Sequence, residues 1–587
     1  MLNLAFVAGQ GVLNYVQHET SAAKRVCAPI CNPHQNRTKC WTTASLPIRE
    51  VWILSVSLWA CSTVVFANPN VCDVRDFGAT GNGRTKDTQT IQKAIEACAQ
   101  KRAGVVYLPS GNYLSGAITL KSNLPLHIEA GATPLASTVV EDCPPIANPW
   151  QPETRQASAL INGDGLENVT ITGRGTIEGQ GKLSYWIGPE RTRPVEGDLW
   201  GHHASQKYDT GYFGGNVVPS GDAYWGPRKA NQTQGSAEAS RQYAHPKMIK
   251  LVRCTNVLVE GLTVQNSPGW TINPIFCERV VFRGLTINNP MDSTSTDAFD
   301  LESCRDVHIS NCTLGAGDDL VTIKSGSEPA GLRINRPWEN ITVTNCTMLQ
   351  GHGAIVIGSE TSGGVRNVTV SNCVFRGTDR GFRLKTQRGR GGVVDGLVAS
   401  NIVMEDVIEP FGITLYYSGR GGIDKPEPVN QGTPVWRNLS FQNIIARGAR
   451  TAGYLLGLPE SPYVWVTFSD VRVWAKDGFT CRWAKDVAFH NVRIDTEAGS
   501  ALACRDMEGL EIDGFRTGAP HLEGPVIGLS QVRDVLLRGS YAARGTGTFV
   551  DLSGDTTRNV VLSGNDLRYA RQAVNVAKEV GKEIVVQ

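Results

Sequence analysis

The sequence predicts an all-β protein, a right-handed parallel β-helix with an N-terminal capping segment that contains one helix. A strand-like phrase recurs along the chain, the starts of its copies are mostly 23–34 residues apart, and no helical pattern lies between them. A period of this size is typical of a solenoid, in which each repeat buries its apolar face against its neighbours. A chain of 587 residues exceeds what one ordinary core organises, and a repeat architecture accommodates that length.

Most copies of the phrase have Asn or Asp, then an apolar residue, then an alternation that ends at Gly or Asn. Alternation that ends in a turn signal predicts a strand. Three copies carry a cysteine directly after an Asn, namely Cys312, Cys346 and Cys373. Equivalent residues on neighbouring coils stack about 4.8 Å apart, so we expect these cysteines to form an inward ladder of free, apolar thiols.

The first part of the chain carries a targeting signal. Residues 51–67 are apolar, follow Arg49 and end in small residues, which is typical of a secretory signal peptide. Residues 1–50 are then either a leader or the result of a start assigned too far upstream. We therefore expect a secreted or periplasmic protein with no stable membrane association after the signal is removed.

The mature chain divides into a cap and a β-helix. Residues 68–145 are expected to form the cap and first strands, including a strand at 105–109, and residues 146–587 the β-helix. Within this segment Asp87 is predicted to cap the N-terminus of a helix. The apolar residues of that helix share one face: Ile91, Ala94, Ile95 and Cys98. Residues 181–246 interrupt the period and are rich in Trp, Tyr, Gly and His, so we expect inserted loops there.

Composition excludes some classes of function. The formal net charge is only +2, so nothing global favours nucleic acid binding, and a polyanionic ligand would need a local basic site. The 15 cysteines in this long chain are too sparse for a disulfide scaffold. No pattern calls for a metal or a cofactor, and we expect a monomer.

Three carboxylates are the strongest chemical signal. Asp318 and Asp319 are adjacent, and Asp297 precedes Asp318 by 21 residues, about one repeat. Neighbouring carboxylates repel one another, so at least one pKa tends to rise. A carboxylic acid that keeps its proton near neutrality is what acid-assisted cleavage of a glycosidic bond requires.

Four further polar residues follow Asp318 at the repeat spacing. His352, Arg383 and Tyr417 follow at steps of 34, 31 and 34 residues, and Lys385 lies two positions after Arg383. Residues one repeat apart fall on consecutive coils, and residues two apart on a strand share a face. The spacing therefore predicts one column of polar side chains that includes the carboxylates.

These motifs resemble glycoside hydrolase family 28, the polygalacturonase family of right-handed parallel β-helices. The matching segments are Ser-Thr-Asp at 295–297, Gly-Asp-Asp at 317–319, Gly-His-Gly at 351–353 and Arg-Leu-Lys at 383–385, with Tyr417 after them. The resemblance implies hydrolysis of α-1,4-galacturonosyl linkages in pectin, with inversion at the anomeric carbon. Inversion leaves room for a water between carboxyl groups, which implies a separation of roughly 6.5–9.5 Å.

The resemblance also implies a role for each residue. Asp318 would be the general acid, while Asp297 and Asp319 would activate the attacking water. His352 would set the protonation of the acid. Arg383 and Lys385 would hold the substrate carboxylate. Tyr417 would shape the adjoining subsite.

Three positions depart from the family pattern. Ser295 stands where Asn is usual, Ala298 replaces a Gly, and Leu320 replaces a Cys. The first two changes favour an alternative, a hydrolase of modified pectin such as rhamnogalacturonan or xylogalacturonan. The inserted loops and the long series of later coils resemble bacterial exo-acting members. Two further alternatives are a calcium-dependent β-helical pectate lyase and a non-catalytic carbohydrate-binding β-helix.

Overall fold

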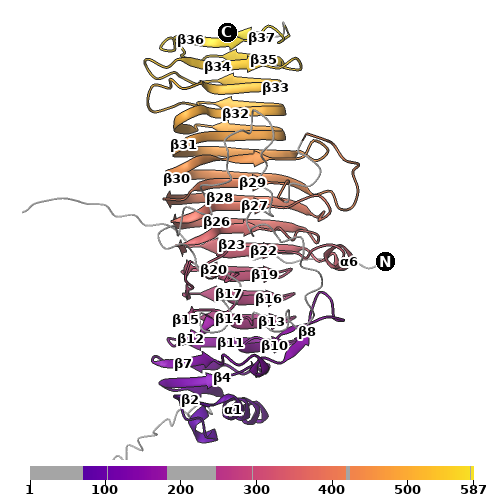
Figure 1. The fold of residues 1–587 in the computed structure, drawn as a ribbon, viewed down its shortest axis with the longest axis vertical. Coiled ribbons are helices and arrows are strands. Elements are labelled where there is room, and N and C mark those ends of the chain that lie inside the picture. The colour runs from indigo at the N-terminus through magenta and orange to yellow at the C-terminus, as the bar shows by residue number, and fades with distance from the viewer. Residues whose placement is uncertain are drawn as a thin grey trace, which may run out of the picture. The chain divides into compact units, whose positions relative to one another are not determined.

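Short parallel strands stack in three columns along the chain (Figure 1). The structure is a computed structural model, and it describes residues 71–586 apart from 102–103, 182–245, 292, 294, 418–423 and 582–583. Consecutive coils pair in register, as Thr255 to Glu278 to Arg305 illustrate. The predicted all-β, right-handed parallel β-helix is confirmed. The predicted leader, the signal peptide and nearly all of the inserted loops lie outside the described residues.

The first column begins at the N-terminal segment and continues through every later coil. Its strands are β1 (Val71–Asp73), β3 (Val105–Leu108), β6 (Leu126–Ile128), β11 (Glu167–Gly173), β14 (Thr255–Glu260), β17 (Glu278–Arg283), β20 (Arg305–Ser310), β23 (Trp338–Thr344), β26 (Val365–Arg376), β28 (Val393–Glu405) and β30 (Val435–Leu456). Alternate side chains enter the core, and β14 shows this pattern clearly, with Val257 and Val259 buried.

The second column lies beside the first and merges with it at β26. Its strands are β2 (Asn82–Lys86), β4 (Gly111–Ser115), β7 (Ala132–Ala136), β12 (Thr176–Glu178), β15 (Thr263–Gln265), β18 (Thr286–Asn288), β21 (Thr313–Gly315) and β24 (Thr347–Met348). The short strands of this column place turns at close intervals, and their central residues, such as Val264 and Ile287, fill the core.

The third column positions the predicted site. Its strands are β5 (Ile118–Thr119), β10 (Ile161–Asp164), β13 (Ile249–Val252), β16 (Ile272–Ile275), β19 (Phe299–Glu302), β22 (Val321–Lys324), β25 (Gly351–Ile357), β27 (Thr378–Lys385) and β29 (Glu409–Thr414). Most residues of these strands are buried on both faces, unlike the half-exposed strands of the first column. A sheet covered on both sides can bury charged groups beside one another.

Three long strands of the later coils run through more than one column: β31 (Tyr463–His490), β32 (Arg493–Asp513) and β33 (Pro525–Arg538). The last strands are short, and each lies in one column: β34 (Thr548–Ser553) with β36 (Gln572–Val576), and β35 (Arg558–Ser563) with β37 (Ile584–Val586). Phenylalanines stack inside these coils: the rings of Phe441 and Phe468 are 5.1 Å apart, and those of Phe468 and Phe489 are 5.2 Å apart. Such stacked pairs add to the burial of apolar area.

The asparagines of the repeat have a structural reason. They occupy a left-handed turn, with φ of 53° at Asn256 and 56° at Asn367, a conformation that Asn adopts more readily than most residues. The Asn367 side-chain amide donates a hydrogen bond of 2.9 Å to Asn340 one coil earlier, and Asn256 does the same to Asn168. The recurring Asn therefore turns the chain and links neighbouring coils.

The thiol ladder predicted from the repeat is confirmed. Cys312, Cys346 and Cys373 are buried and free, as is every cysteine that the structure describes. Each thiol donates to the carbonyl oxygen two residues before it, at 3.2–3.3 Å. These thiols therefore behave as small apolar core residues.

The longest helix among the described residues is α1 (Thr88–Gln100), which packs against β1, β3 and β5. Its buried face is the predicted one, but Asp87 does not cap it with its side chain. The Asp87 carboxylate instead accepts hydrogen bonds from the backbone of Thr80 and Gly81 at 2.8 and 3.0 Å. The described residues also form the five-residue helix α6 (Ala330–Ile334) and two 3-10 turns, at Val74–Phe77 and Val140–Asp142. Strands β8 (Pro145–Ala147) and β9 (Arg155–Ala157) pair in an antiparallel direction.

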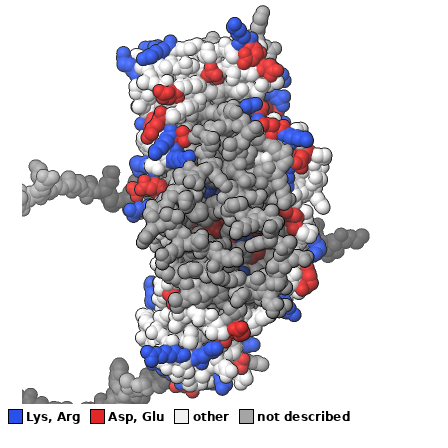
Figure 2. All heavy atoms as spheres, viewed as in Figure 1, with Lys and Arg blue, Asp and Glu red and all other residues white. Residues whose placement is uncertain are grey.

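No helix in the described part of the chain is both long and apolar enough to cross a membrane. Surface charge is balanced rather than gathered: the described coils visible in Figure 2 carry Lys and Arg next to Asp and Glu. Much of this charge is paired between neighbouring coils, such as Arg283 with Glu260 at 2.8 Å and Arg533 with Glu508 at 2.6 Å. Exposed pairs of this kind contribute little stability.

Candidate active site

The third column brings all seven predicted site residues into one connected cluster. Asp297 lies just before β19, and Asp318 and Asp319 lie just before β22. His352 is on β25, Arg383 and Lys385 are on β27, and Tyr417 follows β29. Thr322, Val356 and Arg383 are paired across consecutive strands, so the residues lie on successive coils.

Asp318 is the most accessible of the three carboxylates. Its side chain is 18% exposed, against 3% for Asp319. His352 Nδ1 lies 3.1 Å from Asp318 Oδ1, and the His352 backbone N–H donates to the Asp318 carbonyl at 2.9 Å. Burial alone would raise the pKa of Asp318, but the His352 imidazole and the Arg383 guanidinium, 3.8 Å away, outweigh it and lower that pKa.

Asp319 is clamped by two cations. Arg383 Nη1 donates to Asp319 Oδ1 at 2.6 Å, and Lys385 Nζ donates to Asp319 Oδ2 at 2.9 Å. Burial opposes ionisation, yet these two charges together hold the pKa of Asp319 well below its ordinary value. Gly353 allows this approach, because a Cβ there would lie 2.9 Å from Arg383 Cβ.

Asp297 is the carboxylate whose protonated form the surroundings favour. It is 3% exposed, and the Thr322 hydroxyl lies 3.4 Å from its Oδ2. Burial and then the negative charges of Asp318 and Asp300 raise the pKa of Asp297 well above its ordinary value. The expectation that one carboxylate of the group would be hard to ionise is met at Asp297, the residue that the resemblance assigns to the water.

The three carboxylates form one compact acidic group. One oxygen from each lies within 4.8 Å of an oxygen from each of the others. Carboxylates this close influence one another's ionisation.

The predicted tyrosine lies against the clamp. Lys385 Nζ is 5.3 Å from the centre of the Tyr417 ring, and the Tyr417 backbone N–H donates to Thr386. Tyr416, its neighbour, is 5% exposed and packs in the hydrophobic core. A cation near an aromatic face is attracted to it, so Tyr417 helps to position the ammonium.

The sequence analysis missed an ion pair beside Asp297. Lys324 Nζ lies 2.7 Å from Asp300 Oδ2, and Asp300 is fully buried within β19 rather than at a turn. Burial raises the pKa of Asp300 to about 7 even though Lys324 opposes this. The ring of Trp270 covers the ammonium, with its centre 4.0 Å from Lys324 Nζ. The 24-residue step from Asp300 to Lys324, about one coil, was the signal that could have found the pair.

The three departures from the family pattern have different consequences. Ala298 and Leu320 are fully buried core residues, and Ala298 is not in the left-handed region, so it needs no glycine. Ser295 has a φ of 57°, a conformation that Asn tolerates better than Ser. Only Ser295 therefore changes the frame around Asp297.

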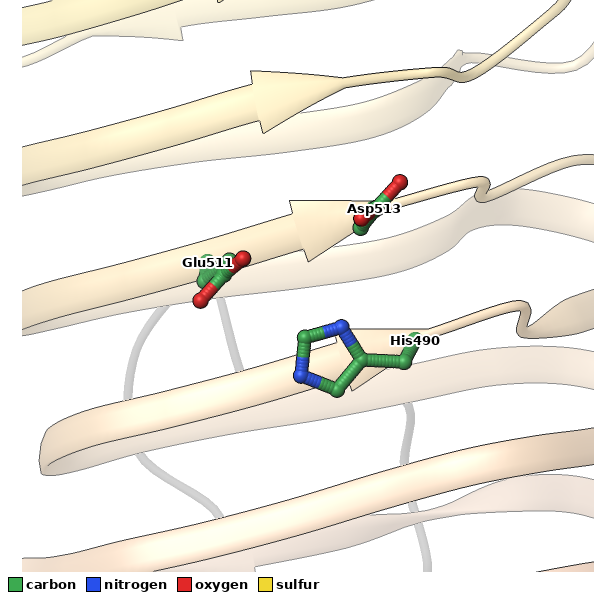
Figure 3. A group of neighbouring side chains, drawn as sticks. All are labelled: His490, Glu511 and Asp513. Atoms are coloured by element: carbon green, nitrogen blue, oxygen red, sulfur yellow. The ribbon is translucent and has the colours of Figure 1, made fainter.

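Among the residues that the structure describes, two groups of side chains have the composition of a metal site. The first is the carboxylate trio itself, but Arg383 and Lys385 already fill both oxygens of Asp319, which disfavours a further cation. The second is His490 on β31 with Glu511 and Asp513 on β32 (Figure 3). Arg538 binds both of those carboxylates, at 2.9 and 3.0 Å. In both groups a basic side chain therefore competes for the oxygens that an ion would need.

Comparison with known proteins agrees with the geometry. The model of the family described as "Glycosyl hydrolases family 28" matches residues 209–504, and that described as "Rhamnogalacturonase A/epimerase, pectate lyase-like" matches residues 71–135. The chain is 26% identical over 455 residues to a probable polygalacturonase of Vitis vinifera, which is 74% of this chain and 82% of the relative. It is 28% identical over 375 residues to an endo-polygalacturonase of Pectobacterium carotovorum subsp. carotovorum, which is 61% of this chain and 77% of that relative.

The chain is also similar to a polygalacturonase of known structure. The crystal structure of a hyperthermoactive exopolygalacturonase from Thermotoga maritima is 28% identical, with a TM-score of 0.58, and the match covers 72% of this chain and 91% of that chain. The family 28 match spans about half of the sequence and contains all seven clustered residues. The chain therefore belongs to glycosyl hydrolases family 28 and is a glycoside hydrolase.

Proposed function

We propose that the protein is a secreted polygalacturonase that hydrolyses α-1,4-galacturonosyl linkages of pectin. The observation that carries this is the contact of Arg383 and Lys385 with the carboxylate trio. Two nearly buried cations beside an acid–base group supply the local positive charge that a polyanionic sugar needs. The overall charge of the chain is too small to do so.

In the proposed mechanism Asp318 protonates the oxygen of the leaving sugar. Its position as the exposed member of the trio supports this role, because a general acid must reach the substrate. Asp297 and Asp319 take up the proton of the attacking water, and His352 holds Asp318 in place. The substrate carboxylate binds Arg383 and Lys385, and Tyr417 borders the same subsite.

The test of this function is incubation with polygalacturonate. Hydrolysis releases reducing ends without ultraviolet absorbance, and added chelator leaves the rate unchanged. A calcium-dependent lyase would instead produce absorbing unsaturated ends and lose its activity with chelator. A non-catalytic binding protein would retain the polymer without cleaving it. Faster cleavage of rhamnogalacturonan or xylogalacturonan than of polygalacturonate would favour the modified-pectin alternative, for which Ser295 is the supporting observation.

We further propose that cleavage proceeds with inversion. The first product released from an α-linkage should then carry a β reducing end, before mutarotation equilibrates it. Proton NMR recorded within the first turnovers distinguishes the two anomers. A first product in the α form would instead assign a nucleophile to the trio and indicate a retaining mechanism.

We propose exo action, supported by the long interruption of the period at 181–246 and by the extended series of later coils. Monomer or dimer should be the product from the earliest time points, with little early loss of viscosity. A ladder of intermediate oligomers at early times would indicate endo action. The control substrate is polygalacturonate of the same length whose non-reducing end is blocked, because only an endo-acting enzyme cleaves it.

Export rests on the signal pattern at residues 51–67. Expression of the full chain in a Gram-negative host should yield a periplasmic or extracellular product that begins close to residue 68. Mass spectrometry of the exported protein identifies that end. Gel filtration of the same material is expected to give a monomer.

A further inference from the structure

The charged side chains near the carboxylate trio form two sets with different partners. Arg383, Lys385 and His352, from β25 and β27, contact Asp318 and Asp319. Lys324, from β22, contacts Asp300, three residues after Asp297. The division matters because a substrate carboxylate that binds the first set would change the charge around Asp318 while Lys324 keeps its own partner.

Lys324 is held firmly in a poorly hydrated position. Its side chain is 11% exposed, its Nζ lies 2.7 Å from a fully buried Asp300, and the Trp270 ring covers it. Neighbouring charges, above all Asp300, outweigh burial and raise the pKa of Lys324 well above its ordinary value. The ammonium is therefore a permanent positive charge one coil from Asp297.

Charged groups from several strands act on Asp297. Asp318, Asp300 and Asp319 favour its protonated form, as burial does, and Lys324 favours its carboxylate. Lys247, whose Nζ is 4.9 Å from the centre of the Trp270 ring, is a second cation that interacts with Asp297. Burial and the acidic neighbours raise the pKa of Asp297, while His352 and Arg383 lower that of Asp318. The proposed mechanism requires the opposite tendency, an ionised Asp297 and a protonated Asp318.

We infer that Lys324 is a positioning residue that stabilises Asp297 as the base carboxylate after a uronate of the substrate occupies Arg383 and Lys385 and Asp318 accepts the proton. This inference rests on the proposed function. One proton leaves an oxygen of Asp297 and arrives at an oxygen of Asp318, directly or through a water, and the charge of the trio is unchanged. The oxygens concerned lie within 4.8 Å of one another.

The substrate carboxylate supplies the driving force. When it pairs with the clamp cations, their field at Asp318 is partly neutralised and a new negative charge stands nearby, which favours the protonated acid. Lys324 keeps its charge because it is paired with the buried Asp300. A neutral sugar at the same place would leave the proton on Asp297, so the arrangement also selects for uronates.

The test is the pH dependence of kcat/KM for Lys324→Met. Loss of the ammonium should move the acid limb to higher pH by about one to three units, the size of effect that one close opposite charge has on a carboxyl group. KM should change little. Lys324→Arg should restore the wild-type limb. An acid limb that does not move in Lys324→Met, with only the thermal midpoint lowered, would overturn the inference.

Lys250→Met is the matched control. Lys250 lies on β13 in the same column, is 1% exposed, and its Nζ has no hydrogen-bond partner among the described residues. It is not among the charges that act most strongly on Asp297. This variant also exchanges a buried lysine for methionine, yet its acid limb should coincide with that of the wild type. An equal shift in both variants would mean that the pH of the acid limb is determined by the burial of a lysine in general, and not by the Asp300–Lys324 pair.

A measurement without turnover separates this inference from the proposed function. In pH-difference infrared spectra the protonated carboxyl band of Asp297, assigned by its loss in Asp297→Asn, should titrate at higher pH in Lys324→Met than in the wild type. D-galacturonate should diminish the wild-type band, and galactose should not. A wild type inactive on polygalacturonate would refute the function alone. An unshifted band in Lys324→Met would refute the role of Lys324 alone.

Discussion

Asp318→Asn is expected to lower kcat on polygalacturonate by about 10²–10⁴-fold, the range that a positioned general acid contributes. Asparagine keeps the size of the side chain and a contact to His352, which lies 3.1 Å from the carboxylate, but it cannot donate a proton to the leaving oxygen. KM should stay within a few-fold, because the clamp cations remain. Initial rates of reducing-end release at saturating substrate measure the effect.

Asp395→Asn is the matched control for that variant. Asp395 is on β28, where it pairs with Arg437 at 2.8 Å, and it has no part in the site. Its kcat should equal that of the wild type. An Asp318→Asn protein with undiminished kcat would show that another group is the acid, and Asp297, whose pKa is raised by burial and by its acidic neighbours, would be the next candidate.

Asp319→Asn is expected to combine a loss of activity with a loss of stability. The change leaves Arg383 and Lys385 buried without their carboxylate partner, and removing one member of a buried ion pair costs about 3–5 kcal/mol. The clamp would also lose its geometry, so kcat/KM should fall with kcat. Denaturant unfolding gives the free energy, and rates normalised to folded protein give the activity.

The stability effect of Asp319→Asn should depend on pH. The pKa of Asp319 is lowered in the folded protein because the two cations outweigh burial. Its stabilising contribution is therefore fully present above the ordinary carboxyl pKa and is lost as the pH falls toward the folded value. The difference in unfolding free energy between wild type and variant should accordingly be largest near neutrality and shrink in acid.

Glu409→Gln provides the control for stability alone. Glu409 lies on β29 and is 3% exposed. It pairs at 2.8 Å with Arg380 on β27, the neighbouring strand of the third column. Breaking this pair should lower the unfolding free energy to a similar degree, while the activity per folded molecule is kept. If Asp319→Asn were as stable as the wild type, the two cations would have found other partners and the clamp described above would be incorrect.

Much of the fold could be predicted from local pattern. The recurring Asn takes a left-handed turn and donates a hydrogen bond to the preceding coil, so it appears in the sequence at nearly every repeat. The thiols of Cys312, Cys346 and Cys373 stack because a parallel β-helix repeats its side-chain directions from coil to coil. The spacing of Asp318, His352 and Arg383 predicted their column for the same reason.

The ionisation of the site could not be predicted in this way. The sequence shows Asp318 next to Asp319, but the partner of each depends on where β25 and β27 carry their side chains. Asp87 failed as a helix cap for a comparable reason, because a loop that closes around it offers backbone N–H groups. The Asp300–Lys324 pair was missed because each residue alone is an ordinary charged residue of a strand.

By itself the sequence determined the β-helix, the order of its coils and the column on which the predicted site residues lie, since these follow from a period that repeats along the chain. Only the tertiary structure decided that Asp319 is clamped, that burial and acidic neighbours favour the protonated form of Asp297, and that Lys324 pairs with Asp300. The physical reason is that ionisation depends on burial and on distances of a few ångströms between coils. A repeat period specifies which residues are neighbours, but it does not specify which of their charges meet.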